Sequence, residues 1–182
     1  MLSFLKYLIQ LVLSPANGWE DIASESPQPR ALMRGGLVPL LCLTAASEFC
    51  ALFWERGVQL GTVVIRALVD FGAYFVAVYI ARLVFDMYME RAVGRKVDTD
   101  RCGVLAVMAV GIMVLIQLAD NICPWHLILL RFLPLYAVLV LYKGAKYLDV
   151  PPQRDISFLL LATLATVVTP LAIYYLFFFI LP

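Results

Sequence analysis

The feature that most constrains this chain is a series of five long apolar stretches separated by short polar connections. They run over Gly35–Trp54, Thr62–Phe85, Gly103–Ile122, His126–Tyr142 and Ile156–Leu181. A helix of about 20 residues crosses a hydrocarbon core of ~30 Å, and only the fourth stretch is at the lower limit of this length. The chain is 63% hydrophobic, whereas a soluble domain is roughly half apolar. We therefore predict an all-α bundle of five transmembrane helices, forming a single membrane domain over residues 1–182.

The basic residues are concentrated on alternate connections. Lys6, Arg30 and Arg34 precede the first stretch; Arg91, Arg95, Lys96 and Arg101 follow the second; Lys143, Lys146 and Arg154 follow the fourth. The other ends carry only Arg56. Because cytoplasmic loops retain positive charge during insertion, this asymmetry predicts a multi-pass integral membrane protein with a cytoplasmic N-terminus and an external C-terminus. In a bacterium this would be the inner (plasma) membrane.

Residues 1–31 form an arm before the first predicted span. Met1–Leu13 is apolar but too short to cross a bilayer, and its polar residues recur at Ser3, Lys6 and Gln10, which is the pattern of an interfacial helix. A cleaved signal peptide is less consistent with it, because no basic residue precedes the apolar run. Ser14-Pro15 then predicts the start of a second helix. We expect two short helices on the cytoplasmic surface.

Several segments together resemble a known family. They are the stretch Leu13–Ile22 (LSPANGWEDI), Val38-Pro39-Leu40, Leu133–Tyr136, Lys143-Gly144, Pro151-Pro152 and Pro170. In this order, and with five spans, the chain resembles the Yip family of Rab-GTPase-interacting membrane proteins. It lacks an Asp-Leu-Tyr-Gly-Pro-type signature and a Gly-Tyr-Gly element, and so looks more like the prokaryotic branch. The resemblance implies a non-enzymatic protein that binds protein partners or organises the membrane, with no catalytic residue.

Five ionisable residues fall inside the predicted spans, all in the outer half of the bilayer: Glu48, Arg66, Asp70, Asp120 and Arg131. A charge at the bilayer centre costs ~2.5–3.5 kcal/mol on insertion scales, so these groups should be paired or hydrated. We expect Arg66 to pair with Asp70 and Asp120 with Arg131. Three interpretations remain open: a structural ion-pair network, an outward-opening site for a cation, proton or small solute, or span boundaries that are misplaced.

Small residues and prolines also predict details of the bundle. Ala73, Ala77 and Ala81 share a helix face with Arg66 and Asp70, and small residues at this spacing allow close helix packing in lipid. Three prolines interrupt predicted spans and should kink their helices: Pro39, Pro134 and Pro170.

Catalytic and metal motifs are not evident in the sequence. The four cysteines show no Cys-x-x-Cys spacing and His126 is the only histidine, so a metal site is not expected. No P-loop, dinucleotide fingerprint or activated nucleophile is recognisable.

We predict a protein that is not an enzyme and needs no cofactor. Its predicted partners are the lipid bilayer and other membrane or peripheral proteins, not nucleic acid, and a homo-oligomer is left open. The alternative function is a small transporter or channel that uses the outer-leaflet polar cluster.

Overall fold

A computed structural model describes residues 2–93, 98–123 and 132–180. The described part is helical and contains no β-strand. Four helical segments are long and apolar enough to cross a membrane: Pro29–Trp54, Leu60–Arg91, Thr99–Ile122 and Pro152–Ile180. They correspond to the first, second, third and fifth predicted spans, so the prediction of an all-helical, multi-pass chain is confirmed at this level.

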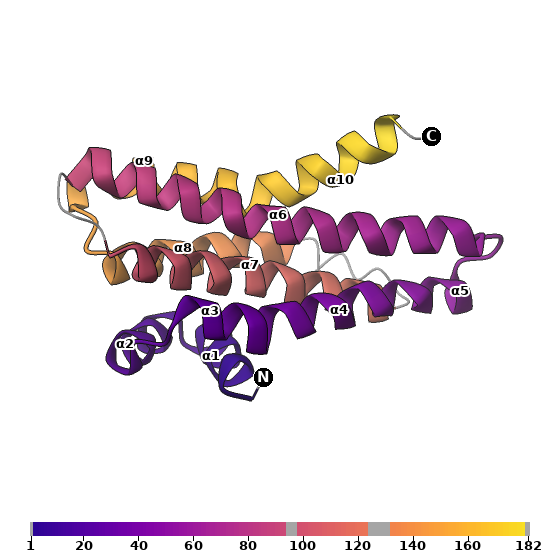
Figure 1. Ribbon diagram of the computed structural model, residues 1–182, viewed down its shortest axis with the longest axis horizontal. Coiled ribbons are helices and arrows are strands. Elements are labelled where there is room, and N and C mark those ends of the chain that lie inside the picture. Colours follow the sequence, from indigo (N-terminus) through magenta and orange to yellow (C-terminus); the bar gives the residue numbers. More distant parts are fainter. Residues whose placement is uncertain (1, 94–97, 124–131, 181–182) are drawn as a thin grey trace.

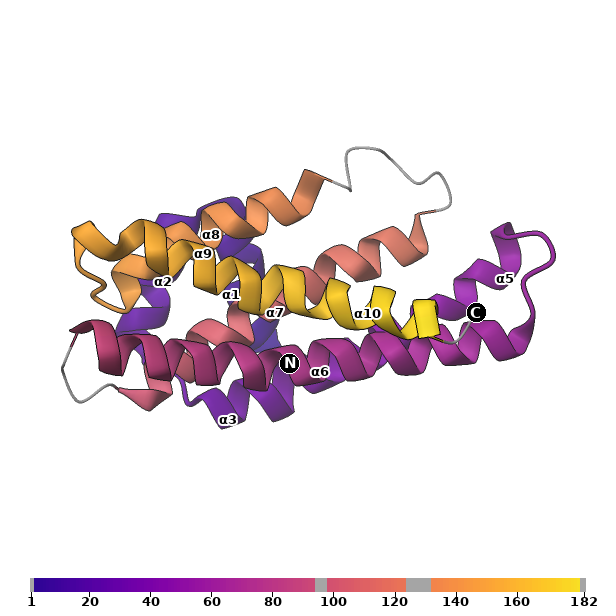
Figure 2. The same cartoon turned by 90° about the horizontal axis from the view of Figure 1, so that it is seen from above.

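The remaining predicted span, His126–Tyr142, is described only from residue 132 onward. Residues 124–131 lie outside the described part, and helix α8 covers Leu133–Tyr147. Figure 2 shows α8 beside α9 within the bundle. A fifth span therefore stays a prediction.

Each long segment is built from one or more helical elements. The first contains α3 (Pro29–Leu32), the π-helical turn η1 (Met33–Leu37), α4 (Val38–Ser47), the 3-10 turn η2 (Glu48–Cys50) and α5 (Ala51–Trp54). The second is α6 (Leu60–Val93) and the third is α7 (Thr99–Ile122). The last contains the 3-10 turn η4 (Pro152–Arg154), α9 (Asp155–Thr163), the π-helical turn η5 (Leu164–Val168) and α10 (Thr169–Ile180). Helix α6 continues beyond Phe85, where the second predicted span ends, and includes the charged residues that follow, up to Val93.

Helix α7 lies at the centre of the bundle and packs against α4, α6 and α8. Its most apolar window is 72% buried, against 33% for the window in the last segment. The alanine face predicted for α6 is confirmed, because Ala73, Ala77 and Ala81 are all buried. Small side chains let α6 approach its neighbours closely along the whole seam.

Two of the three prolines follow wide turns. Pro39 is the second residue of α4, which follows η1, and Pro170 is the second residue of α10, which follows η5. Proline lacks an N–H and clashes with the carbonyl four residues back, and a π-helical turn absorbs this misfit. Pro134 behaves differently from the prediction: it lies in the first turn of α8, where proline interrupts nothing.

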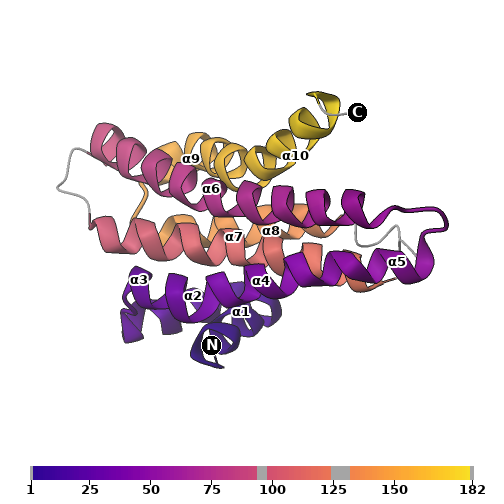
Figure 3. The same ribbon diagram turned by 45° about the vertical axis from the view of Figure 1, so that its right-hand side comes forward.

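The N-terminal arm consists of α1 (Leu2–Leu13) and α2 (Pro15–Glu25), which pack together and lie on the side of the bundle opposite α9 and α10 (Figures 1 and 3). The indole Nε1 of Trp19 donates to the carbonyl oxygen of Val140 at 3.0 Å, and its ring stacks on Tyr147 at 5.2 Å. Phe4 is only 1% exposed and lies over Gly36. One apolar face of the arm is thus buried against other helices of the same chain, whereas Leu2, Ile9 and Leu13 of α1 are exposed.

The polar stripe predicted on α1 also has protein partners. Lys6 forms an ion pair with Glu25 at 3.4 Å, Tyr7 donates to the same carboxylate, and Gln10 donates to Asp21. Burial and the hydrogen bond to Glu25 raise the pKa of Tyr7 to about 12, and the same hydrogen bond lowers the pKa of Glu25 below its usual value. These contacts hold α1 against α2.

Candidate functional site

Two buried carboxyl groups meet at the α5 end of the bundle. Glu48 begins the 3-10 turn η2 and is 8% exposed, and Asp70, on α6, is 4% exposed. Their carboxyl groups lie next to each other. Two carboxylates this close repel each other, so such a pair is stabilised by a shared proton or by a bound positive charge. The pair is therefore a candidate place for the protein to bind a proton or an equivalent positive charge.

Amide side chains of α7 connect this pair to α4. Gln117 donates through Nε2 to Asp70 Oδ2 at 3.5 Å and to Asn121 Oδ1, one turn away, at 2.9 Å. Asn121 in turn donates through Nδ2 to Ser47 Oγ at 3.0 Å and to the carbonyl oxygen of Thr44 at 3.3 Å. The three helices α4, α6 and α7 are thus joined by a continuous polar network inside an otherwise apolar bundle.

Arg66 does not pair with Asp70, which corrects the expectation from the sequence. Its Nη1 lies 2.9 Å from Oε2 of Glu55, the residue that directly follows α5. Asp70 lies one turn further along α6 and faces Glu48 instead. The physical reason is the hairpin between α5 and α6, which brings Glu55 to the level of Arg66 although the two residues are eleven apart in sequence.

Two hollows lie beside the carboxyl pair. The first, of about 270 Å³, is lined by Glu48, Ala51, Trp54, Glu55, Arg66, Gln117, Asp120, Asn121, Cys123 and Tyr174. The second, of about 480 Å³, is lined by Asp70, Tyr74, Met113, Ile116, Gln117, Asp120, Pro134, Pro170, Leu171, Tyr174 and Tyr175. They share three lining residues, Gln117, Asp120 and Tyr174. Together they reach both buried carboxyl groups from two sides.

Helix α10 tilts away from the rest of the bundle, as Figures 1 and 3 show, and its residues Pro170, Leu171, Tyr174 and Tyr175 line the second hollow. The tilt follows the π-helical turn η5 and Pro170. The proline that the sequence marked as a packing kink therefore also shapes one wall of the site.

Of the five residues predicted for this site, the structure brings Glu48 and Asp70 into contact and places Arg66 and Asp120 on the hollows. Arg131 lies outside the described residues, so its pairing with Asp120 stays a prediction. We use the name carboxyl cluster for Glu48, Glu55, Asp70 and Asp120 together with Arg66, Gln117 and Asn121.

Several members of the site were missed. Glu55, Tyr74 and Tyr174 were not among the residues predicted from the sequence. Tyr74 donates from its hydroxyl to Gln117 Oε1 at 3.4 Å. A signal for the α4 side was present in the sequence: Thr44, Ser47 and Glu48 fall on one helix face, which is a polar stripe in an otherwise apolar span.

Within the described residues, no group of three or more His, Cys, Asp or Glu side chains is arranged to hold a metal ion. Comparisons with protein-family models, with curated proteins and with solved structures find no match for this chain.

Proposed function

We propose that this chain is a small, non-enzymatic transport protein of the membrane, and that its carboxyl cluster binds a proton or a small monovalent cation. The observation that carries the proposal is the buried Glu48–Asp70 pair, which two hollows reach from different sides. A purely structural pair would need no such access. An acidic pair within reach of a solute can gain and lose a positive charge.

The charge of the cluster supports a cation over an anion. Four carboxyl groups and one guanidinium line the two hollows. Arg66 is engaged with Glu55, and the predicted partner of Asp120 is Arg131. With both arginines assigned to other carboxyl groups, Glu48 and Asp70 have each other as their nearest ionisable neighbours. Ionisable groups within membrane spans are costly, so they are usually paired or functional.

Proteoliposomes can test this proposal directly. We expect liposomes that contain the wild-type protein to take up protons, Na⁺ or K⁺ faster than empty liposomes, read by a trapped pH dye and by radioactive ⁸⁶Rb⁺ and ²²Na⁺. Asp70→Asn and Glu48→Gln should abolish the uptake. Glu90→Gln is the matched control, because Glu90 is an exposed carboxylate near the opposite end of α6. No uptake of any of the three cations by the wild-type protein would contradict the proposal.

The competing function is that of a scaffold that binds protein partners or organises the bilayer, as the resemblance to the Yip family implies. The observation that favours it is the saturation of the network, in which the amides of Gln117 and Asn121 and the guanidinium of Arg66 all have protein partners. A scaffold predicts a large loss of thermal stability for Asp70→Asn and no cation flux. A transport site predicts loss of flux with a well-folded protein.

We also propose five spans with the N-terminus in the cytoplasm. The alternating basic loops support this topology, and the antiparallel course of α7 and α8 in Figure 2 is compatible with it. In a variant without native cysteines, a cysteine introduced at Arg56 should react with an impermeant maleimide from outside. One introduced at Lys146 should react only after permeabilisation, and labelling of Lys146→Cys in intact cells would contradict the topology.

A further inference from the structure

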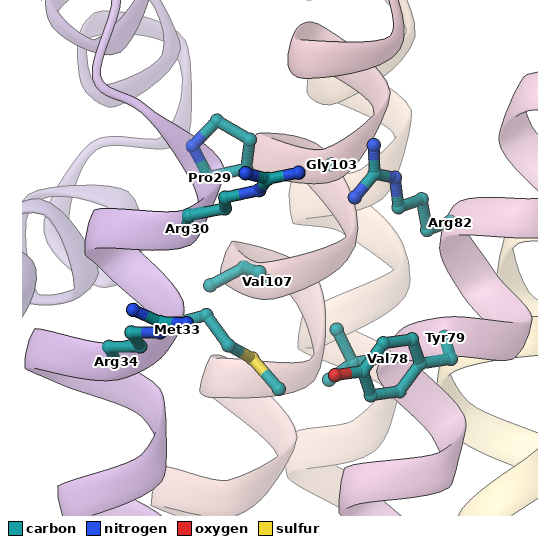
Figure 4. A pocket seen from close by; sticks show the side chains of 9 residues that line it. All are labelled: Pro29, Arg30, Met33, Arg34, Val78, Tyr79, Arg82, Gly103 and Val107. Atoms are coloured by element: carbon teal, nitrogen blue, oxygen red, sulfur yellow. The ribbon is translucent and has the colours of Figure 1, made fainter.

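A separate hollow of about 320 Å³ lies at the other end of the bundle, between the start of the first long segment and α6 (Figure 4). It is lined by Pro29, Arg30, Met33, Arg34, Val78, Tyr79, Arg82, Gly103 and Val107. It shares no residue with the hollows of the carboxyl cluster. We refer to it as the arginine pocket.

Three guanidinium groups line the arginine pocket and no carboxylate does. In Figure 4, Arg30 and Arg82 extend from opposite walls toward the space above Gly103, and Arg34 lies further along the wall that carries Arg30. Arg82 has one acidic neighbour, Asp86, at 3.8 Å. Within the described residues, Arg30 and Arg34 have no ion-pair partner. The pocket thus has an excess of positive charge.

Gly103 lets Pro29 pack tightly against α7 at the floor of the pocket. A Cβ atom at this position would lie 3.0 Å from Cβ of Pro29 and 3.8 Å from Cζ of Arg82. A larger residue would therefore push Pro29, and with it the neighbouring Arg30, away from α7. The glycine thus keeps the walls that carry Arg30 and Arg82 close to each other.

The pocket becomes more apolar toward its deeper end, where Arg34 lies beside Met33 in Figure 4. Gly103 is near the start of α7, and Val107 is one turn deeper, about 6 Å further into the bundle. Met33, Val78 and Tyr79 lie on the side of Val107 in Figure 4, away from Arg30 and Arg82. A ligand that fits both parts has an anionic head and an apolar tail.

We propose that the arginine pocket binds the phosphate headgroup of an anionic phospholipid, with the start of an acyl chain along Met33, Val78 and Val107. Arginine suits this role because its planar guanidinium makes two parallel hydrogen bonds to phosphate and is weakly hydrated. Basic pockets between spans on the cytoplasmic side are known to hold such headgroups. The predicted topology places the pocket on that side, but the proposal depends on neither the transport function nor the identity of any solute.

Native mass spectrometry and thermal shift of the detergent-purified protein can test the lipid site. The probes are phosphatidylglycerol, phosphatidylcholine and inorganic phosphate, each at the same ionic strength. We expect phosphatidylglycerol to remain bound and to raise the melting temperature, and phosphatidylcholine and inorganic phosphate to do neither. Equal binding of phosphatidylcholine, or binding of inorganic phosphate alone at the same concentration as the lipid, would overturn the proposal.

Variants can show whether the arginines of the pocket bind the lipid. The double variant Arg30→Gln/Arg34→Gln should bind phosphatidylglycerol at least about tenfold more weakly, since charge-assisted hydrogen bonds are lost. These two side chains are exposed, so their replacement should leave folding intact. Arg91→Gln is the matched control, because Arg91 is also at this end of α6 but half a helical circumference away from Arg82. An equal loss of binding in Arg91→Gln would indicate general surface charge and would overturn the proposal.

Discussion

The contact between Phe4 and Gly36 allows a sharp test of how the N-terminal arm is held. A Cβ atom added to Gly36 would lie 2.2 Å from Cγ and 2.4 Å from Cβ of Phe4. Phe4 is almost fully buried, so its ring has no free space to enter. The neighbouring Gly35 provides the matched control, because a Cβ added there meets nothing within 4 Å.

Gly36→Ala and Gly35→Ala should change the free energy of unfolding in opposite directions. Overpacking costs ~1–3 kcal/mol, and Gly36→Ala should reach the upper half of this range because Cβ of Phe4 is fixed to the backbone of α1. Gly→Ala in a helix recovers about 0.5–1 kcal/mol. The net destabilisation of the docked arm should therefore be about 1–2.5 kcal/mol for Gly36→Ala. Gly35→Ala should stabilise the helix by about 0.5–1 kcal/mol.

Hydrogen–deuterium exchange of the α1 amides measures this change. In Gly36→Ala the arm should open about 5–70 times more often, and exchange in α9 should stay unchanged. Adding Phe4→Ala removes the ring contact but keeps Cβ, so the two changes should be coupled by roughly 1 kcal/mol, with only part of the clash relieved. The same exchange rate in Gly36→Ala and Gly35→Ala would refute the packing of Phe4 on Gly36.

The remaining predictions concern pH and single contacts. The Tyr7–Glu25 hydrogen bond should hold α1 to α2 across neutral pH. Because the pKa of Glu25 is lowered, its contribution to the stability of the docked arm is present above about pH 4.5 and is lost as the pH falls further. Because the pKa of Tyr7 is raised to about 12, its contribution is complete below pH 10 and is lost as the pH rises through 12. Exchange of the α1 amides against pH measures both limits, and a constant rate from pH 3 to 12 would contradict this. Trp19→Phe should destabilise the docked arm by ~1–3 kcal/mol because the carbonyl of Val140 loses its indole donor, and thermal unfolding of the purified protein should show it; an unchanged melting temperature would argue against the bond. Glu55→Gln should cost at most ~1 kcal/mol, since its pair with Arg66 is partly exposed, and a larger loss in the same assay would indicate a more buried pair.

The long helices and their packing seams could be read from the sequence because they depend on local pattern. Apolar length predicts a spanning helix, and residues spaced by three or four positions share a face, so the buried alanines of α6 were predictable. The meeting of acidic residues near one end of the bundle could also be expected from depth along each span. These features need no knowledge of which helices are neighbours.

The partners within the site could not be read in the same way. The sequence favoured a pair within α6, but the side chain of Asp70 faces Glu48 on a different segment, and Arg66 is reached by Glu55 across a hairpin. Partner choice depends on the rotation of each helix about its axis and on which neighbour ends at the same level. Neither quantity is encoded in the spacing of one helix alone.

The docking of the arm has a consequence for the order of assembly. Trp19 and Val140 are 121 positions apart, and the hydroxyl of Tyr136 donates to the carbonyl of Val12 across 124 positions. The arm leaves the ribosome before α7 and α8, so the surface of these helices on which it packs is formed only later in synthesis. Until then the apolar faces of α1 and α2 need another apolar environment, and the surface of the bilayer is the nearest one. The amphipathic pattern of the arm would then serve in succession, first to hold a nascent segment at the lipid interface and later to close the finished bundle.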